Sequence, residues 1–263
     1  MNFLLFLVVG LRVISLVPSV TETIYLLHAD SVLVANTIYG DYPPAARKKP
    51  KVGDMLNPKI DKIIKLKPDY IFVTLPMQKF VAQKLEKLGL KVIAVSPESI
   101  EGILETIEIV GKYTHHEARA RFVVDSLKAI LDSLKKTVPR KKLRTYFELS
   151  PRPLYTAGGK SFINEVISIA GGVNIFGRLK VPYPVVRQED VIRADPEIIL
   201  LSYPHASPAA VKKRIGWNKI TAVRKNCIFK VNPALFDRPG PRVFKAIVEL
   251  RKLIQGCISS KQP

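Results

Sequence analysis

The chain has 263 residues, of which 47% are hydrophobic, so it can form the cores of two ordinary domains and is not intrinsically disordered in composition. Its 42 Lys and Arg residues outnumber its 22 Asp and Glu residues, which gives a formal net charge of +20. Such an excess attracts anionic partners such as nucleic acid, anionic lipid or an acidic protein. Because the basic residues are spread along the chain, without zinc-finger spacing or a basic strand interleaved with aromatic residues, we expect no nucleic-acid binding.

The first ten residues contain an apolar run from Phe3 to Val9 that has the length of the central part of a signal peptide. The run has no basic segment before it, no small-residue cleavage site after it and no following cysteine for lipid attachment. It is also too short to span a bilayer. We therefore interpret residues 1–10 as an incomplete export signal, the result of a misassigned start codon, or an additional edge strand.

The next part of the chain alternates between apolar strands and segments of helical periodicity. Strands are predicted at residues 12–17, 32–35, 70–73 and 92–95, and helices at residues 19–27, 58–66 and 80–88. The first helix is predicted to begin with a capping box, in which Ser19 is the N-cap and Glu22 lies three residues later. This alternation indicates a parallel sheet with helices on both faces.

A long amphipathic helix follows, beginning at a second capping box formed by Thr114 and Glu117 and ending before Pro139. Its apolar stripe is predicted to contain Phe122, Leu127, Ile130, Leu131, Leu134 and Val138. About 24 residues at about 1.5 Å each give a length of roughly 36 Å, which is the dimension of a small domain. We expect this helix to connect two lobes.

The remainder of the chain repeats the alternation of strands and helices. Strands are predicted at residues 145–149, 198–201 and 227–231, and helices at residues 161–170, 188–193, 209–215 and 241–254. Ser207 followed by Pro208 is typical of a helix start, with an N-cap and a proline at the first helical position.

The predicted fold class is therefore α/β, with two Rossmann-like lobes whose central parallel sheets are joined by one long rigid α-helix. We expect an N-terminal lobe at residues 11–112, the connecting helix at residues 113–138 and a C-terminal lobe at residues 139–263. Two lobes of similar construction suggest a cleft between them, and clefts of this kind bind ligands.

The sequence does not indicate a metal centre. The two cysteines, Cys227 and Cys257, do not form a CxxC pair, and the sequence leaves open whether they form a disulfide. His115 and His116 are adjacent, and neighbouring side chains on a helix diverge by about 100°, so both cannot bind one ion.

Enzymatic chemistry is also poorly supported by the motifs. The segment Gly159-Lys160-Ser161 resembles the end of a phosphate-binding loop, but Leu154 stands where that loop requires its first glycine. No spacing rule selects a pair among the loop carboxylates Asp41, Asp54 and Asp237. We expect a protein that is not an enzyme; the alternatives are a Rossmann-like enzyme acting on a nucleotide or phosphorylated substrate, and an adhesin with the same fold.

Aromatic side chains in the predicted loops give a better indication of function. The residues at or near strand ends, or in loops rich in proline and glycine, are Tyr39, Tyr42, Tyr155, Tyr183 and Phe236. Loops at the carboxyl ends of parallel strands form the binding crevice of an α/β sheet. Aromatic rings there suit a bulky, flat ligand because they offer a large apolar surface with little loss of entropy.

Motifs across the chain carry a resemblance to a known family. They are the segments at residues 12–22 (RVISLVPSVTE), 41–44 (DYPP), 66–69 (LKPD), 155–159 (YTAGG), 171–176 (GGVNIF), 181–184 (VPYP) and 238–242 (RPGPR). In order and spacing, the chain resembles the ABC-importer substrate-binding proteins whose lobes are joined by a rigid helix. Within that class it is similar to the cobalamin-binding branch, with siderophore and haem binders as relatives.

The resemblance implies a binding site rather than a cofactor, with cobalamin or another bulky metal chelate as the ligand. Tyr39, Tyr155 and Tyr183 match positions where the family holds the corrin with aromatic side chains. Met55 and Thr74 stand where relatives have further aromatics, and an acidic contact of the family falls near Ala234, beside Phe236. The ligand-binding set expected from the resemblance is Tyr39, Met55, Tyr155, Tyr183 and Phe236.

The resemblance also implies a partner. Family members dock on the permease subunits through one acidic residue on each lobe, and the matching positions are Asp61 and Glu189, each at the start of a helix. We accordingly expect an extracytoplasmic or periplasmic, membrane-associated monomer that meets the membrane surface only through its transporter. Because the hinge is a helix, closure on the ligand should be small.

Overall fold

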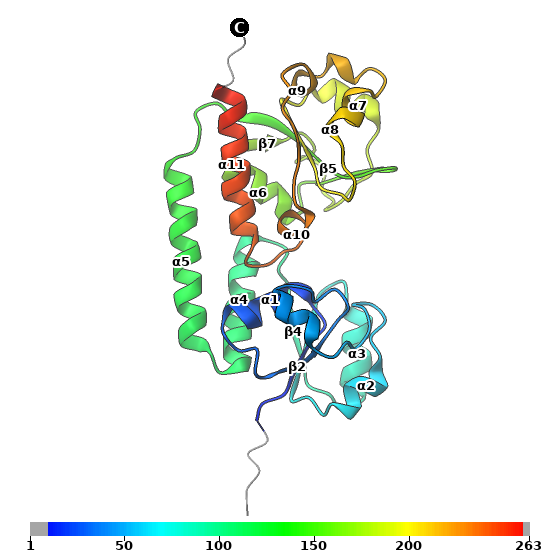
Figure 1. Ribbon diagram of the computed structural model, residues 1–263, viewed down its shortest axis with the longest axis vertical. Helices are drawn as coiled ribbons and strands as arrows, with labels where there is room; N and C mark the ends of the chain where they lie inside the picture. Colours follow the sequence, from blue (N-terminus) through cyan, green and yellow to red (C-terminus); the bar gives the residue numbers. More distant parts are fainter. Residues whose placement is uncertain (1–9, 260–263) are drawn as a thin grey trace, which may run out of the picture. The chain divides into compact units, whose positions relative to one another are not determined.

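A computed structural model describes residues 10–259, and the chain divides into two compact units (Figure 1). Unit 1 comprises the residues up to Pro97 together with Glu101–Asp125, and unit 2 comprises Glu98–Ile100 together with the residues from Ser126 onward. The division falls within helix α5 (Glu117–Lys136), which contributes to both units. The sequence interpretation of residues 1–9 lies outside the described residues, and the predicted domain boundaries stay a prediction.

Unit 1 is built on a parallel sheet with the strand order β2-β1-β3-β4. Its strands are β1 (Val13–Ser15), β2 (Leu33–Asn36), β3 (Tyr70–Thr74) and β4 (Val92–Val95). Its helical segments are α1 (Pro18–Leu26), η1 (Pro44–Lys48), α2 (Ile60–Lys65), α3 (Lys79–Lys87) and α4 (Ile100–Thr114), followed by the first part of α5.

The side chains of β3 alternate between the two faces of this sheet, as the period of two in a strand requires. Ile71 and Val73 belong to a buried cluster with residues of α2 and α3, so these two helices cover one face. Tyr70 and Phe72 point the other way and meet the ring of Tyr113 in α4 edge-on, with ring centroids 5.0 and 6.4 Å apart. The core of unit 1 therefore has helices on both faces of the sheet.

Unit 2 contains a five-stranded sheet in which the strand order is β6-β5-β8-β9 and β7 also pairs with β5. Its strands are β5 (Leu143–Pro151), β6 (Leu154–Thr156), β7 (Gly172–Asn174), β8 (Ile198–Leu201) and β9 (Ile228–Lys230). Its helical segments are α6 (Phe162–Ala170), α7 (Gln188–Ala194), α8 (Pro208–Lys212), η2 (Trp217–Lys219), α9 (Thr221–Arg224), α10 (Pro233–Phe236) and α11 (Val243–Ser259). The pairing of β6 with β5 is antiparallel and the other pairings are parallel.

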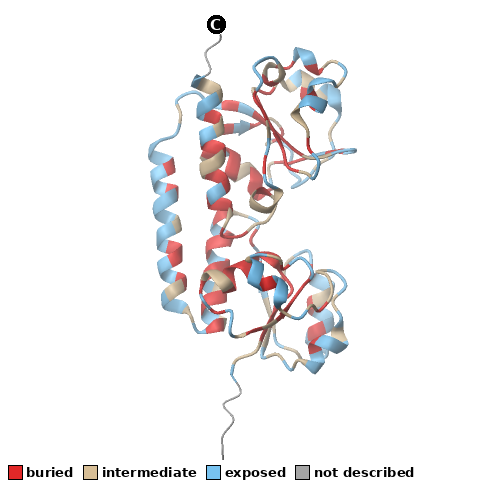
Figure 2. Cartoon of the chain, viewed as in Figure 1, coloured by how far each residue is buried: buried red, intermediate tan, exposed pale blue. Residues whose placement is uncertain are grey.

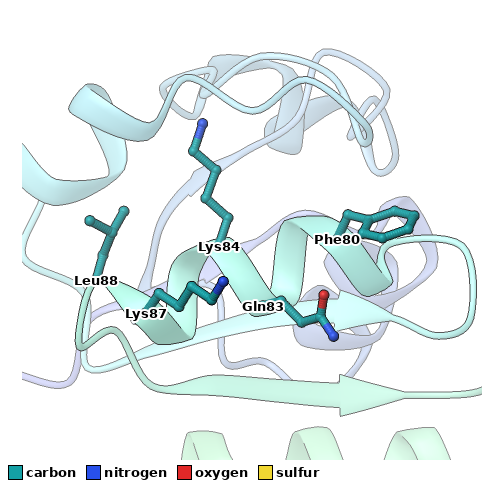
Figure 3. A pocket seen from close by; sticks show the side chains of 5 residues that line it. All are labelled: Phe80, Gln83, Lys84, Lys87 and Leu88. Carbon is teal, nitrogen blue, oxygen red and sulfur yellow. The ribbon is translucent and has the colours of Figure 1, made fainter.

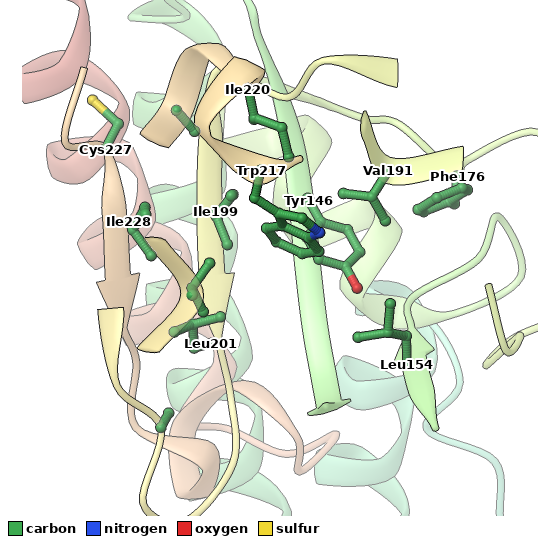
Figure 4. Packing of buried hydrophobic residues seen from close by; sticks show 13 residues of the cluster. Tyr146, Leu154, Phe176, Val191, Ile199, Leu201, Trp217, Ile220, Cys227 and Ile228 are labelled. Atoms are coloured by element: carbon green, nitrogen blue, oxygen red, sulfur yellow. The ribbon is translucent and has the colours of Figure 1, made fainter. Parts of the chain in front are cut away.

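Aromatic rings fill the core on both faces of the unit 2 sheet. On one face Trp217 packs edge-on against Tyr146 of β5, with ring centroids 6.1 Å apart (Figure 4). On the other face Phe147 lies against Phe236 at a centroid distance of 6.0 Å. The central strands and the inward faces of the helices are mostly buried, while the outward helix faces are exposed (Figure 2).

Arg251 in α11 connects three helices within unit 2. Its buried guanidinium donates hydrogen bonds to backbone carbonyl oxygens near the ends of two other helices. The acceptors are Leu134 and Thr137 at the end of α5, and Ile169 and Ala170 at the end of α6, at 2.6–3.0 Å. One cation thus donates to four carbonyl groups at helix ends, where intrahelical donors run out and the helix dipoles are negative.

A disulfide joins Cys227, directly before β9, to Cys257 in α11, with the Cα atoms 6.1 Å apart. The sequence left this pairing open, and the structure resolves it. The bridge links the edge strand of the unit 2 sheet to the helix that carries Arg251.

The predicted α/β class with parallel sheets is confirmed, but both predicted capping boxes are wrong. Helix α1 begins at Pro18 after the N-cap Val17, so Ser19 and Glu22 lie inside the helix. A proline at the first helical position favours this earlier start. Thr114 is the last residue of α4 rather than an N-cap, and its hydroxyl donates to the Val110 carbonyl at 2.7 Å.

The apolar stripe of α5 is also displaced from its predicted position. Phe122, Ile130 and Val138 are exposed, whereas Leu131 and Leu134 are buried as expected. Ala120, Val123 and Val124 complete the buried stripe. The cause is α4, a helix that was not predicted: a side chain on its Gly111 would collide with Ala120, so the two helices approach closely at this point and fix which face of α5 is covered.

Candidate functional site

The carboxyl ends of the unit 1 strands lie at one edge of the sheet, where Gln78 joins three segments. Its buried side-chain oxygen accepts from the backbone N–H of Thr74 at 2.7 Å, at the end of β3. Its amide nitrogen donates to the Met55 carbonyl at 2.6 Å and to the Leu16 carbonyl, after β1, at 3.4 Å. The loop of Met55 is thereby fixed at the carboxyl edge, where a ligand of a parallel sheet binds.

Two polar side chains shape the loop that carries Tyr39. Asn36, the buried last residue of β2, and Lys51 both donate to the carbonyls of Gly40 and Ala46 at 3.0–3.2 Å. The two side chains also contact each other, because Lys51 Nζ donates to Asn36 Oδ1 at 2.6 Å. Burial lowers the pKa of Lys51, an effect that Asp41 partly opposes. The loop is therefore held from inside while Tyr39 stays 50% exposed.

Large apolar side chains gather in the loops at this edge of unit 1. The exposed ones are Ile38, Tyr39, Tyr42, Leu56 and Met77. Exposed apolar clusters of this kind mark ligand or protein contacts more often than isolated surface residues do. Thr74, the other position where the resemblance implied an aromatic, ends β3 at the same edge.

In unit 2, two segments that are distant in sequence bring Tyr155 and Tyr183 together. The backbone N–H of Thr156 donates to the Pro184 carbonyl at 3.1 Å, and that of Gly158 donates to the Pro182 carbonyl at 2.8 Å. Tyr155 and Tyr183 thus lie on neighbouring paired segments beside the carboxyl end of β5, and 41% and 44% of their surfaces are exposed.

Asp237 lies near Tyr183 at the same edge. Ser202, directly after β8, donates a hydrogen bond from its hydroxyl to Asp237 Oδ1 at 2.5 Å. Burial raises the pKa of Asp237 to about 7, although the Ser202 hydrogen bond and the charge of Arg238 oppose the shift. Burial also raises the pKa of Tyr183 to about 12, with Asp237 and Glu98 adding to it. The edge of unit 2 therefore combines two phenol rings with a carboxyl group that titrates near neutral pH.

Phe236 departs from the expected ligand-binding set. Its ring is fully buried against Phe147, so it belongs to the core of unit 2 and offers no surface to a ligand. Pro233 begins the short helix α10 after the N-cap Asn232, and this turn directs Phe236 inward. Asp237, the next residue, faces the edge instead.

A buried ion pair supports the same edge of unit 2 from within. Glu148 of β5 is fully buried and accepts from Arg214 at 2.6 and 2.7 Å, and from the Tyr203 hydroxyl at 2.9 Å. The Arg214 guanidinium also lies 4.4 Å from the centre of the Trp217 ring. Because both oxygens of this carboxylate have donors, the group ties β5 to the segments of Tyr203 and Arg214 and is not available for chemistry. No sequence signal pointed to it, since Arg214 is 66 residues from Glu148.

The two acidic residues expected at the docking surface are both exposed. Asp61 lies in the first turn of α2 and Glu189 in the first turn of α7. Neither takes part in an ion pair within residues 10–259. Both carboxylates are therefore available to a cationic partner.

Metal chemistry and membrane crossing find no support in the part of the chain that the structure describes. No group of three His, Cys, Asp or Glu side chains there could hold a metal ion. No helix within residues 10–259 is both long and apolar enough to pass through a bilayer.

Known proteins show what this chain is similar to. The family model described as periplasmic binding protein matches residues 13–235. A vitamin B12-binding protein of Vibrio parahaemolyticus is 32% identical over 244 residues, covering 91% of this chain and 87% of that protein. An ABC transporter substrate-binding lipoprotein of Bacillus subtilis, itself uncharacterised, is 30% identical over 252 residues, covering 92% and 79%.

A solved structure of a vitamin B12-binding protein is similar to this chain as well. The crystal structure of the periplasmic vitamin B12-binding protein of Vibrio cholerae superposes with a TM-score of 0.83 at 27% identity, covering 95% of this chain and 98% of that chain. This likeness extends over both units. The chain therefore belongs to the periplasmic binding protein family, whose members are substrate-binding proteins of ABC importers and not enzymes.

Proposed function

We propose that this protein binds a corrinoid such as vitamin B12 and delivers it to the permease of an ABC importer. The observation that carries the ligand class is the 32% identity to a vitamin B12-binding protein over 91% of the chain. The geometry supports a bulky ligand with apolar faces, because exposed aromatic and aliphatic side chains lie at the carboxyl edges of both sheets.

The proposed contacts are Tyr39 and Met55 from unit 1, and Tyr155 and Tyr183 from unit 2. Burying these side chains against a corrin supplies most of the affinity, while polar groups at the edges fix its orientation. Asp237 replaces Phe236 in the proposed set, because its carboxyl group is at the edge and Phe236 is in the core.

The ligand class is tested by equilibrium dialysis of the purified protein against cyanocobalamin, ferric hydroxamate siderophore and haemin in parallel, read by visible absorbance. We expect stoichiometric retention of cyanocobalamin alone. Retention of haemin or the ferric siderophore instead would move the protein to another ligand class, and retention of none of them would contradict the proposal.

We also propose that Asp61 and Glu189 dock the loaded protein on the permease. Support comes from their exposure, from the lack of an ion pair to either within the described residues, and from their place in first turns of helices in different units. The variant Asp61→Ala/Glu189→Ala should bind ligand as tightly as the wild type yet support no uptake. Lys62→Ala/Arg187→Ala changes exposed residues beside the two acids and serves as the matched control. Uptake by the acidic-site variant at the wild-type rate would remove these residues from the docking surface.

The protein is proposed to work outside the cytoplasm, as the description of its family suggests. The Cys227–Cys257 disulfide supports this location, because structural disulfides persist in oxidising compartments and are rare in the reducing cytosol.

A further inference from the structure

The outward face of α3 carries apolar and basic side chains that the proposed binding site does not use. Phe80, Gln83, Lys84, Lys87 and Leu88 line a shallow pocket on this face, with Phe80 and Leu88 at opposite ends of the helix (Figure 3). Phe80 is 82% exposed and Leu88 is 50% exposed. We call these five residues the α3 surface.

The packing of α3 fixes this exposure. Ala82 and Leu85, on the opposite side of the helix, are buried in the core of unit 1. Positions 80, 84, 87 and 88 recur at the spacing of one helix face, so they point to solvent as a set. Turning Phe80 inward would bring Ala82 and Leu85 out of the core, so the solvent-facing side of α3 is a stable property of unit 1.

The charged side chains of the α3 surface are both lysines. Lys84 and Lys87 are exposed, and neither forms an ion pair within the part of the chain that the structure describes. With Lys79 at the start of α3 and Glu86 near its end, the helix carries three exposed lysines and one exposed acid between residues 79 and 87. A nucleic acid would satisfy the lysines but leave Phe80 and Leu88 in water. An anionic bilayer satisfies both kinds of side chain, because apolar residues enter the interfacial layer while lysine amines reach the lipid phosphates.

We propose that the α3 surface binds anionic lipid membranes directly, with Phe80 and Leu88 in the interfacial layer and Lys84 and Lys87 at the lipid phosphates. The net charge of +20 strengthens the attraction. This contact would hold the protein where its permease resides. Direct lipid binding goes beyond the proposed ligand delivery and replaces the expectation that the chain meets the membrane only through its transporter.

Flotation of the full chain with vesicles tests the proposal. The wild type should float with vesicles of equal parts phosphatidylglycerol and phosphatidylcholine at low salt, and remain unbound with phosphatidylcholine alone. Phe80→Ser/Leu88→Ser should weaken the partition onto anionic vesicles by about tenfold or more. Lys84→Gln/Lys87→Gln should weaken it by about 25-fold, from roughly fivefold per lysine near the surface.

Ile215 provides the matched control, because it is 94% exposed beside Lys212 and Lys213 but belongs to unit 2. The variant Ile215→Ser should bind vesicles within about twofold of the wild type. An equal loss in Ile215→Ser, wild-type binding by Phe80→Ser/Leu88→Ser, or equal binding to both vesicle types would overturn the proposal.

Thermal unfolding of each variant checks that the fold is intact, and it should match the wild type because the changed side chains are exposed. Cyanocobalamin binding is measured on the same samples. If the wild type binds vesicles but no cyanocobalamin, the proposed function is wrong and lipid binding is confirmed. If it binds cyanocobalamin but no anionic vesicles, lipid binding is wrong and the proposed function is unaffected.

Discussion

Asp237 is a carboxyl group whose burial couples the stability of the fold to pH. Its pKa is about 7 in the folded chain against 3.8 as the ordinary value. Between these values the unfolded chain has released the proton that the folded chain still holds, so raising the pH favours unfolding. The stability that the protonated Asp237 carboxyl group contributes is fully present below pH 4. It is lost progressively as the pH rises to 7, and it changes no further above pH 7.

The variant Asp237→Asn should remove this loss, because the amide stays neutral at every pH. Relative to the wild type it should gain stability between pH 4 and 7, by at most about 4 kcal/mol and by less to the extent that water reaches the side chain. Urea unfolding of both proteins at a series of pH values measures the difference. Asp125→Asn, at an exposed position of α5, controls for the loss of one negative charge. Parallel pH curves for Asp237→Asn and the wild type would rule out the assigned role of the carboxyl group.

Some side chains of the proposed site were accessible to sequence reasoning and others were not. Tyr39, Tyr155 and Tyr183 are in loops at strand ends, and the structure shows them exposed there, while their contact with a ligand stays a prediction. Phe236 occupies a similar loop position in the sequence, but the short helix beginning at Pro233 turns it into the core. That orientation depends on packing against Phe147, which is 89 residues away and leaves no local signal.

The buried polar residues that shape the edges are invisible in the sequence for a related reason. Gln78 and Lys51 act through backbone carbonyls of remote segments, such as Met55 and Gly40. Backbone acceptors are present at every residue, so no residue type in the sequence indicates which of them a side chain will meet.

The contact between α11 and the ends of α5 and α6 depends on the side chain of Arg251. Replacing it by Leu removes donors from the carbonyls of Leu134, Thr137, Ile169 and Ala170 without opening a large cavity. The Leu134 carbonyl keeps the backbone N–H of Thr137, but the loss of the Arg251 hydrogen bonds and of the cation at two helix ends should lower the free energy of unfolding by about 3 kcal/mol.

Chemical denaturation of Arg251→Leu against the wild type measures this loss. Lys252→Leu, at the exposed next position of α11, is the control and should change stability by less than about 0.5 kcal/mol. Equal stability of Arg251→Leu and the wild type would show that the hydrogen bonds do not stabilise the helix ends.

Strong periodic patterns predicted the main elements, because each pattern reports one buried face. The apolar runs at β3, β4 and β8 and the helices α2, α3 and α6 all fall where the sequence placed them within a few residues. The strands β6 and β7 have three residues each and were missed, because they lie among proline and glycine residues, whereas the equally short β1 and β9 lie within longer apolar runs. Helix α4 was missed as well, and that omission led to the wrong stripe on α5.

The Cys227–Cys257 disulfide is the covalent link between the sheet of unit 2 and its last helix. It closes a loop of 30 residues, for which the chain-entropy model gives a stabilisation of about 3 to 4 kcal/mol. The variant Cys227→Ser/Cys257→Ser should therefore unfold at lower temperature than the wild type, and adding a reductant should lower the wild-type transition to meet it. The reductant should leave the variant unchanged. If complete reduction leaves the unfolding temperature of the wild type unchanged, the disulfide does not stabilise the fold.

The whole chain is proposed to act as one receptor, in which the carboxyl edges of two separate sheets contribute to binding a single ligand molecule. Isothermal titration with cyanocobalamin of the wild type, Tyr39→Ala and Tyr183→Ala tests that claim, because Tyr39 belongs to unit 1 and Tyr183 to unit 2. We expect one ligand per chain and an affinity loss of about tenfold or more in each variant. A stoichiometry of two, or wild-type affinity in either variant, would contradict it.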